Sequence, residues 1–305
     1  MKRVHVSILL ATVFALTSSS AFACACGCGV FSVGTSSLLP NGAGVTAFLE
    51  YDYMNQTQNW NGTSSAPLAD NDDKNIRSDF YTAGLQYMFN RDWGINISVP
   101  YTQRLFATED NGSIGTFDHG AIGDIRVVGV YSGFSDDMSS GLTFGLKLAN
   151  GDYTYQGFDR DTAIGTGTTN LLLGGYHEGN LNAINTWSWF VQGQFDRAFN
   201  TRAGYRPGNE LDAAAGVYYT GWDVGAKGTL APVLQVLISN RWRDSGVNAD
   251  SDNSGYQRVL AAPGLEYDNG KFRVYADVEF PIYQNVNGNQ LVPPRLYKLI
   301  FSYSF

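Results

Sequence analysis

Three cysteines lie close together near the start of the chain, and they are the only cysteines in it. Cys24, Cys26 and Cys28 form the sequence Cys-Ala-Cys-Gly-Cys-Gly. Three thiolates at this spacing can converge on a soft metal ion, so they are candidate ligands for copper or zinc. The alternatives are one disulfide with a thiol left over, pairing with another chain, or a lipid attached to Cys24. The residue types alone leave all of these open.

A second group of candidates consists of charged residues on the polar faces of alternating segments. If these faces line a pore, the charges would select solutes electrostatically. The alternative is that they pair with one another and fill a narrow interior. The candidates are Asp124, Arg126, Lys147, Arg273, Asp277 and Glu279.

Residues that could carry out catalysis are sparse. The motif Gly-x-Ser-x-Gly is absent, and His177 with Ser188 is the one pair that a turn would bring near each other. The adjacent carboxylates Asp72 and Asp73 fall in a predicted loop without EF-hand spacing, which indicates solvated charge. A net charge of −8 argues against nucleic acid as a partner. We therefore predict a protein that is not an enzyme.

The elements that must position these residues are strands, and the clearest is the last one. From Tyr297 to Phe305 apolar and aromatic residues alternate with others, a period that predicts a strand with one greasy face. Such a strand is stable when it closes a barrel and turns that face to lipid. It resembles the C-terminal signature of bacterial outer-membrane barrels, which implies recognition by the barrel-assembly machinery.

The N-terminus predicts export. Lys2 and Arg3 precede a largely apolar stretch at 4–16, and Ala21-Phe22-Ala23 is a cleavage site of the A-x-A type. Residues 1–23 are therefore predicted to be a signal peptide, and residues 24–41 a periplasmic segment rich in Cys, Gly and Ser that serves as a short plug. Residues 42–305 would form an outer-membrane β-barrel.

Twelve alternating stretches follow the predicted plug, and no run of eighteen apolar residues occurs after residue 23. They lie at 45–53, 81–89, 93–101, 125–131, 142–148, 171–173, 187–191, 211–219, 230–238, 259–267, 272–280 and 297–305.

Long and short connections alternate between these stretches. The long ones are 55–77, 105–121, 150–167, 199–209, 245–255 and 284–294, and the short ones are 90–92, 135–140, 178–185, 221–227 and 268–270. This alternation is typical of outer-membrane barrels, with long loops outside the cell and tight turns in the periplasm. The sequence therefore predicts an all-β fold, a closed antiparallel transmembrane β-barrel of about twelve strands.

Three segments resemble a known family. They are Gly-Ala-Ile-Gly-Asp-Ile at 120–125, Gly-Leu-Lys-Leu-Ala-Asn-Gly-Asp at 145–152 and Gly-Thr-Gly at 165–167. In this order they resemble the meta-pathway phenol-degradation-like transporters, which are related to the long-chain fatty-acid porins. Ala149 departs from the family's usual Pro. The resemblance gives Asp124, Lys147 and Asp152 as motif positions with a structural role.

The resemblance and the barrel pattern together predict the function. We expect an outer-membrane channel, exported by its signal peptide in a Gram-negative bacterium, for passive passage of small hydrophobic or aromatic solutes. Its predicted partners are outer-membrane lipid, lipopolysaccharide and the solute, and no cofactor is required. The alternative is a metal-handling or electron-transfer accessory that uses the three N-terminal cysteines, with the barrel as housing.

Overall fold

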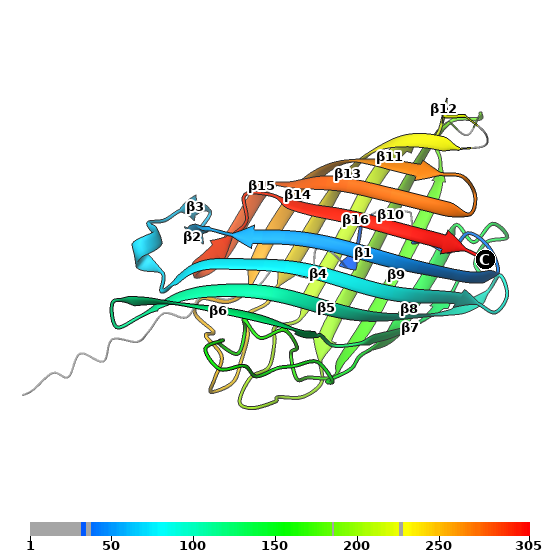
Figure 1. The fold of residues 1–305 in the computed structure, drawn as a ribbon. Helices are drawn as coiled ribbons and strands as arrows, with labels where there is room; N and C mark the ends of the chain where they lie inside the picture. The colour runs from blue at the N-terminus through cyan, green and yellow to red at the C-terminus, as the bar shows by residue number, and fades with distance from the viewer. Residues whose placement is uncertain (1–31, 35–37, 185, 226–227) are drawn as a thin grey trace, which may run out of the picture.

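The computed structural model describes residues 32–34, 38–184, 186–225 and 228–305. These residues form long antiparallel strands that curve into a barrel (Figure 1). In chain order the strands are β1 (Gly44–Gln56), β2 (Gln58–Gly62), β3 (Ser64–Ser65), β4 (Asp73–Met88), β5 (Trp93–Asp110), β6 (Ser113–Ile122), β7 (Arg126–Tyr131) and β8 (Ser140–Lys147). They continue with β9 (Asn170–Asn180), β10 (Trp187–Ala198), β11 (Glu210–Tyr219), β12 (Trp222–Asp223), β13 (Thr229–Arg241), β14 (Tyr256–Asp268), β15 (Phe272–Val292) and β16 (Leu296–Ser304). The short 3-10 helix η2 (Leu68–Asp70) lies between β3 and β4.

The first and last barrel strands close the barrel. β1 pairs with β16 in an antiparallel register that runs from Thr46↔Ser304 to Met54↔Leu296. β1 also pairs with β4, and each later barrel strand pairs with the next along the chain, back to β16. With β6 and β7 counted as one interrupted strand, and the short β2, β3 and β12 left aside, the described residues form twelve barrel strands. The predicted fold class is confirmed.

One barrel strand is broken in the middle. β6 and β7 both pair with β5, and residues 123–125 between them leave the ladder. β7 pairs on its other edge with β8, whereas β6 pairs with β5 alone among the described strands. The barrel wall beside β6 is therefore covered by a loop rather than by a neighbouring strand.

The outward face of the barrel is apolar. Leu49, for example, is 61% exposed although it lies in the middle of β1, and the side chains that alternate with it point into the barrel. The same outward pattern recurs around the wall at Leu85, Ile97, Phe144, Leu173, Val191, Leu234, Ile238, Leu265 and Phe301. Because water would penalise such a continuous apolar surface, this face contacts lipid. Among the described residues, no helix has the length and apolarity needed to cross a bilayer.

Several strands run further than the alternation predicted. The predicted loop 105–121 is instead a hairpin, because β5 continues to Asp110 and β6 begins at Ser113. The predicted loop 284–294 is largely strand as well, since β15 reaches Val292 and pairs there with β2. A membrane-spanning strand needs about 9–11 residues, so these extensions stand beyond the lipid. Because one face of each extension no longer contacts lipid and the other no longer lines the lumen, apolar and polar residues need not alternate there as they do within the membrane.

The barrel is not hollow throughout. Side chains of β13, β14, β15 and β16 form a buried cluster inside the wall, which includes Leu237, Leu260, Tyr275 and Ile300. Val33, from the segment before β1, belongs to the same cluster. This packing fills part of the interior, and the remaining open space is bordered by side chains of β1, β4, β5, β7–β11, β13 and β16.

Candidate solute cavity

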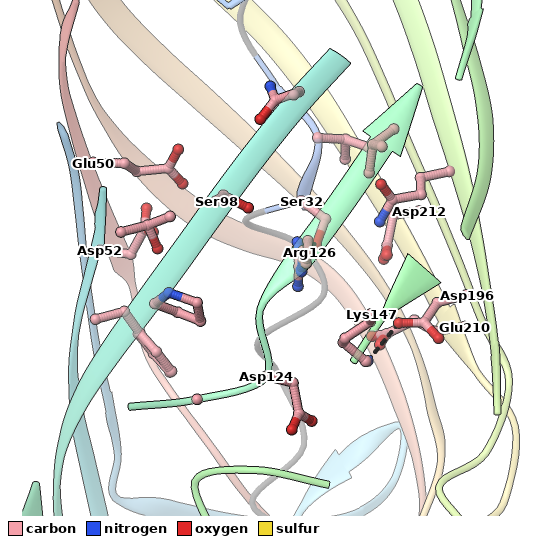
Figure 2. A pocket seen from close by; sticks show the side chains of 18 of the residues that line it. Ser32, Glu50, Asp52, Ser98, Asp124, Arg126, Lys147, Asp196, Glu210 and Asp212 are labelled. Atoms are coloured by element: carbon pink, nitrogen blue, oxygen red, sulfur yellow. Dashed lines mark hydrogen bonds and ion pairs between the residues drawn. The ribbon is translucent and has the colours of Figure 1, made fainter. Parts of the chain in front are cut away.

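A cavity of about 350 Å³ lies inside the barrel. Its walls come from the inward faces of β1, β4, β5, β7–β11, β13 and β16, and its lining combines charged side chains with apolar ones (Figure 2). The barrel has a long-loop end, near residues 148–169, and a short-turn end, near residues 132–139. In outer-membrane barrels the long loops face the cell exterior.

The segment that precedes β1 narrows the cavity toward the short-turn end. Ser32 Oγ accepts a hydrogen bond from Arg126 Nη1 at 2.9 Å, so a residue of this segment contacts the wall at mid-height. The carbonyl of Leu38 accepts a hydrogen bond from Gln86 Nε2 at 3.3 Å. Leu39 then packs against a buried cluster close to the short turns, composed of Met88, Val130, Met138 and Tyr176.

The loop of residues 148–169, between β8 and β9, borders the cavity toward the long-loop end. Arg104 on β5 reaches this loop and donates from Nη1 to the carbonyls of Thr162 at 2.6 Å and Ala163 at 3.2 Å. The ring of His119 on β6 also contacts this loop, because it stacks on the ring of Tyr155 with ring centroids 3.7 Å apart. These contacts hold the loop against the barrel wall beside β6, whose second edge pairs with no described strand.

Asp124 fixes this loop at the break between β6 and β7. Its Oδ1 accepts a hydrogen bond from the Gly151 backbone at 3.0 Å, and its Oδ2 accepts two from Thr166, at 2.8 Å from the backbone and 2.7 Å from the hydroxyl. A Cβ on Gly151 would lie 2.6 Å from the backbone carbon of Gly123, so the approach requires glycine. The three segments of the family resemblance therefore meet here, with Asp124 in a structural position.

Asp152 joins the same junction. Its backbone N–H donates to the carbonyl of Ile122 at 3.1 Å, and its carboxylate lies 2.8 Å from His119 Nε2. The Gly165 N–H donates to the Asp152 carbonyl at 2.6 Å. The loop is thus tied to both sides of the broken strand.

Two closed ion pairs stand on opposite parts of the cavity wall. Lys147 Nζ lies 2.5 Å from Asp196 Oδ2, and Asn170 donates to the other oxygen of Asp196. On the facing wall, Lys298 Nζ lies 3.1 Å from Glu50 Oε1 and 3.8 Å from Asp52 Oδ1. Lys147 therefore lines the cavity, but Asp196 already balances its positive charge.

Arg126 lies between these walls. Figure 2 shows its side chain in the middle of the view, with Glu50 and Asp52 to one side and Asp196, Glu210 and Asp212 to the other. Its hydrogen bond to Ser32 directs the guanidinium toward the N-terminal segment. Arg126 is thus the predicted candidate that lies closest to the centre of the cavity in this view.

The other three candidates lie away from the open space. Asp277 and Glu279 are buried in the filled part of the barrel, where Asp277 Oδ2 accepts hydrogen bonds from Tyr275 at 2.7 Å and Gln235 at 2.9 Å. Arg273 lies near the short turns, with Nε 2.6 Å from Asp268 Oδ2. The structure thus brings Asp124, Arg126 and Lys147 together at the cavity and separates the remaining three from it.

Several charged residues of the cavity were not among the predicted candidates. Arg160 and Asp161 lie in the 148–169 loop, and the others lie on strands: Glu50, Asp52, Arg104, Asp196, Glu210, Asp212, Arg241 and Lys298. Those on strands occupy inward positions, so the alternation itself was a signal for them. The three cysteines and the predicted signal peptide lie outside the described residues, and those predictions stay predictions.

The long-loop end carries carboxylates with altered acidity. Burial, together with the neighbouring carboxylates of Asp250 and Asp72, raises the pKa of Asp159 to about 6. Burial also raises the pKa of Asp161 well above its usual range, helped by the charge of Asp159. Both residues belong to the 148–169 loop, so the charge of this loop changes in mildly acidic solution.

Comparison with known proteins identifies the fold. No family model and no curated protein matches the chain. Among solved structures, an outer membrane channel from Pseudomonas putida F1 is similar with a TM-score of 0.66 and 12% identity, over 90% of this chain and all of that one. The β domain of the Bordetella autotransporter BrkA has a TM-score of 0.51 and 12% identity, over 86% of this chain and all of that one. The CymD monoaromatic hydrocarbon channel has a TM-score of 0.45 and 9% identity, over 94% of each chain.

The fold is therefore that of Gram-negative outer-membrane barrels. Together with the apolar outward face, it locates the protein in the outer membrane.

Proposed function

We propose that the protein is an outer-membrane channel for the passive passage of small hydrophobic or aromatic solutes. The observation that carries this proposal is the cavity of about 350 Å³ inside a closed barrel whose outer face contacts lipid. A space of this size suits a compact molecule such as a substituted benzene. The likeness to a solved outer membrane channel and the resemblance of residues 120–167 to the phenol-degradation-like transporters support the same function.

The lining of the cavity supports passage of solutes that are mainly apolar and carry few polar groups. Apolar side chains from several elements line the cavity, among them Phe48 on β1, Phe80 on β4, and Val128 and Val130 on β7. Because neutral polar side chains such as Thr82 on β4 and Asn96 and Ser98 on β5 line the same cavity, a solute can exchange water for either kind of contact. This combination favours weak binding at several points, which a conducting path requires.

Two segments would control access to this path. Residues 24–41 would act as a plug from the short-turn end, and the 148–169 loop would restrict the long-loop end. The contacts of Ser32, Leu38 and Leu39 with the barrel wall support the plug, and those of Asp124 and Arg104 support the fixed loop.

Planar bilayers test the channel directly. The purified mature protein should give discrete current steps, and a neutral aromatic alcohol added to the bath should shorten or block them as it occupies the cavity. A variant without residues 24–41 should give larger steps. Absence of current from both proteins, with folding verified by circular dichroism, would overturn the proposal.

A further inference from the structure

We propose that Arg77 and Arg295, on the lipid-facing surface of the barrel, bind a phosphate group of lipopolysaccharide in the outer leaflet of the membrane. These two residues are called the arginine pair below. The pair lies on the outside of the barrel wall at the long-loop end, away from the cavity. The inference therefore does not depend on the proposed channel function.

The register of three neighbouring strands brings the two arginines together. Arg77 on β4 is the partner of Asn55 on β1, and on the other edge of β1 Met54 is paired with Leu296 of β16. Continued by one residue, the second register sets Arg295 beside Asn55. Figure 1 shows β16, β1 and β4 side by side in the wall. Because neighbouring strands lie about 4.8 Å apart, the Cα atoms of the arginine pair are about 10 Å apart, within reach of one ligand.

Both arginines belong to the outward series of their strands, in which every second residue points away from the lumen. Arg77 has the same parity as Leu85 on β4, which is exposed. In the same way, Arg295 has the parity of Phe301 on β16, which is exposed as well. Leu296, which follows Arg295, is fully buried on the inward face. The two guanidinium groups are therefore presented to the surroundings of the barrel rather than to its lumen.

The arginine pair lies at the outer border of the membrane. Residues 77–87 of β4 have the length of about 9–11 residues that crosses a bilayer. Tyrosine is enriched at the interface between membrane and water, and outward tyrosines lie just below the pair, toward the membrane centre. Their ring centroids are 6.0 Å apart for Tyr53 and Tyr297, 5.2 Å for Tyr51 and Tyr81, and 6.4 Å for Tyr81 and Tyr101. The arginines therefore stand at the level of the lipid headgroups.

The guanidinium groups keep donors available for a ligand. Arg295 is exposed, and it makes no hydrogen bond or ion pair with the described residues. Arg77 Nε lies 3.7 Å from Asp79 Oδ2, and the two Nη atoms of Arg77 have no hydrogen-bond partner in the described part of the chain. Asp79 in turn accepts a hydrogen bond from the Tyr51 hydroxyl at 2.8 Å. Two positive charges thus face one negative charge, and the unused N–H groups belong to the positive ones.

A phosphate group on a lipid matches this site. The planar guanidinium can donate two parallel hydrogen bonds to a phosphate, which makes arginine well suited to this partner. Below the pair the outward surface is apolar, with Leu49, Ala83 and Leu299 on the same three strands, so acyl chains attached to the headgroup can pack there. Lipopolysaccharide, one of the predicted partners, carries phosphate groups on its lipid A anchor and offers both halves of this match. A free phosphate ion would use the arginines alone.

Lipid binding to the purified mature protein in detergent tests the inference. Native mass spectrometry, with bisphosphorylated lipid A added at graded concentrations, gives the dissociation constant of the first bound lipid. Arg77→Gln and Arg295→Gln should each raise this constant by about fivefold, the factor that one cation near an anionic lipid surface contributes. The double variant should raise it by more than tenfold, and circular dichroism verifies that each variant is folded.

Arg197→Gln is the matched control on another part of the wall. Arg197 is an exposed outward residue of β10, and residues 187–197 of that strand span the same length as 77–87 of β4. Its register partner on β9 is the apolar Leu171. Removing this charge should change the dissociation constant by less than twofold. A weakening as large as that of Arg295→Gln would show uniform attraction between charges and would overturn the assigned site.

Two further comparisons decide whether the site recognises phosphate on a lipid. Lipid A without its phosphate groups should bind equally weakly to the unsubstituted protein and to the double variant. Sodium phosphate should displace no more bisphosphorylated lipid A than sodium chloride does at the same ionic strength. Stronger displacement by phosphate would identify a site for the free ion and contradict the assignment to a lipid.

Unchanged binding of bisphosphorylated lipid A in the folded double variant would refute the inference. If the double variant does not fold, Arg295→Gln decides, because Arg295 is exposed and lies just before β16. An unchanged dissociation constant in that variant would refute the inference as well.

Discussion

Replacing Lys298 with Met should strongly destabilise the folded barrel. Lys298 is almost fully buried, with 2% of its side chain exposed, and its ammonium lies 3.1 Å from Glu50 and 3.8 Å from Asp52. Methionine keeps the length of the side chain and removes the charge. Two carboxylates then remain in the lumen wall without the cation that they face.

The expected cost is that of breaking a buried ion pair by removing one partner, about 3–5 kcal/mol in the free energy of unfolding. This corresponds to a change of roughly a hundredfold to several thousandfold in the unfolding equilibrium. Urea titration of the protein in phospholipid vesicles, followed by tryptophan fluorescence, measures this change. Lys271→Met, in an exposed turn, is the matched control and should shift the midpoint little.

A compensating variant distinguishes lost charge balance from lost packing. When Glu50→Gln and Asp52→Asn are added to Lys298→Met, the two carboxylates nearest the lost ammonium are neutralised as well, and part of the stability should return. A loss below about 1 kcal/mol for Lys298→Met alone would refute the reasoning, because that is the magnitude of an exposed pair. A triple variant no more stable than the single one would refute it as well.

Three further predictions concern the loop and the N-terminus. The folded protein raises the pKa of Asp159 to about 6, so the folded loop binds a proton at this carboxyl group more tightly than the unfolded chain does. The loop should therefore be most stable at about pH 4 and below, and lose stability as the pH rises through 6. Hydrogen exchange of residues 148–169, compared at about pH 4 and above pH 6, should show this loss, and Asp159→Asn should remove it. Gly151→Ala should cost about 1–3 kcal/mol by overpacking the junction, measured by urea titration, whereas Gly42→Ala, where nothing lies within 4 Å, should be neutral. Changing the three N-terminal cysteines to serine should leave channel current unchanged, and a loss of bound copper or zinc by elemental analysis would instead support the metal-handling alternative.

The barrel was predictable because lipid imposes a rule on every strand. An outward side chain in the bilayer must be apolar, so positions such as Leu49 and Phe301 reveal both the strand and its orientation. The rule weakens where the surroundings change. Around Leu172, which is 1% exposed inside the barrel, both faces are apolar and the alternation is lost.

The cavity was less accessible to sequence reasoning. Inward charges could be recognised by position, but not their pairing: Lys147 lies 49 residues from Asp196, and Lys298 lies 248 residues from Glu50. Which charges face open space also depends on how side chains fill the barrel. Asp277 and Asp124 look alike in the sequence, yet one is buried in the filled part and the other secures the loop that borders the cavity.

The most direct test of the channel function is the current through single molecules of the mature protein in a planar bilayer. We expect discrete steps of current that grow when residues 24–41 are removed and that a neutral aromatic alcohol blocks. A folded protein that gives no steps, with or without those residues, would contradict it.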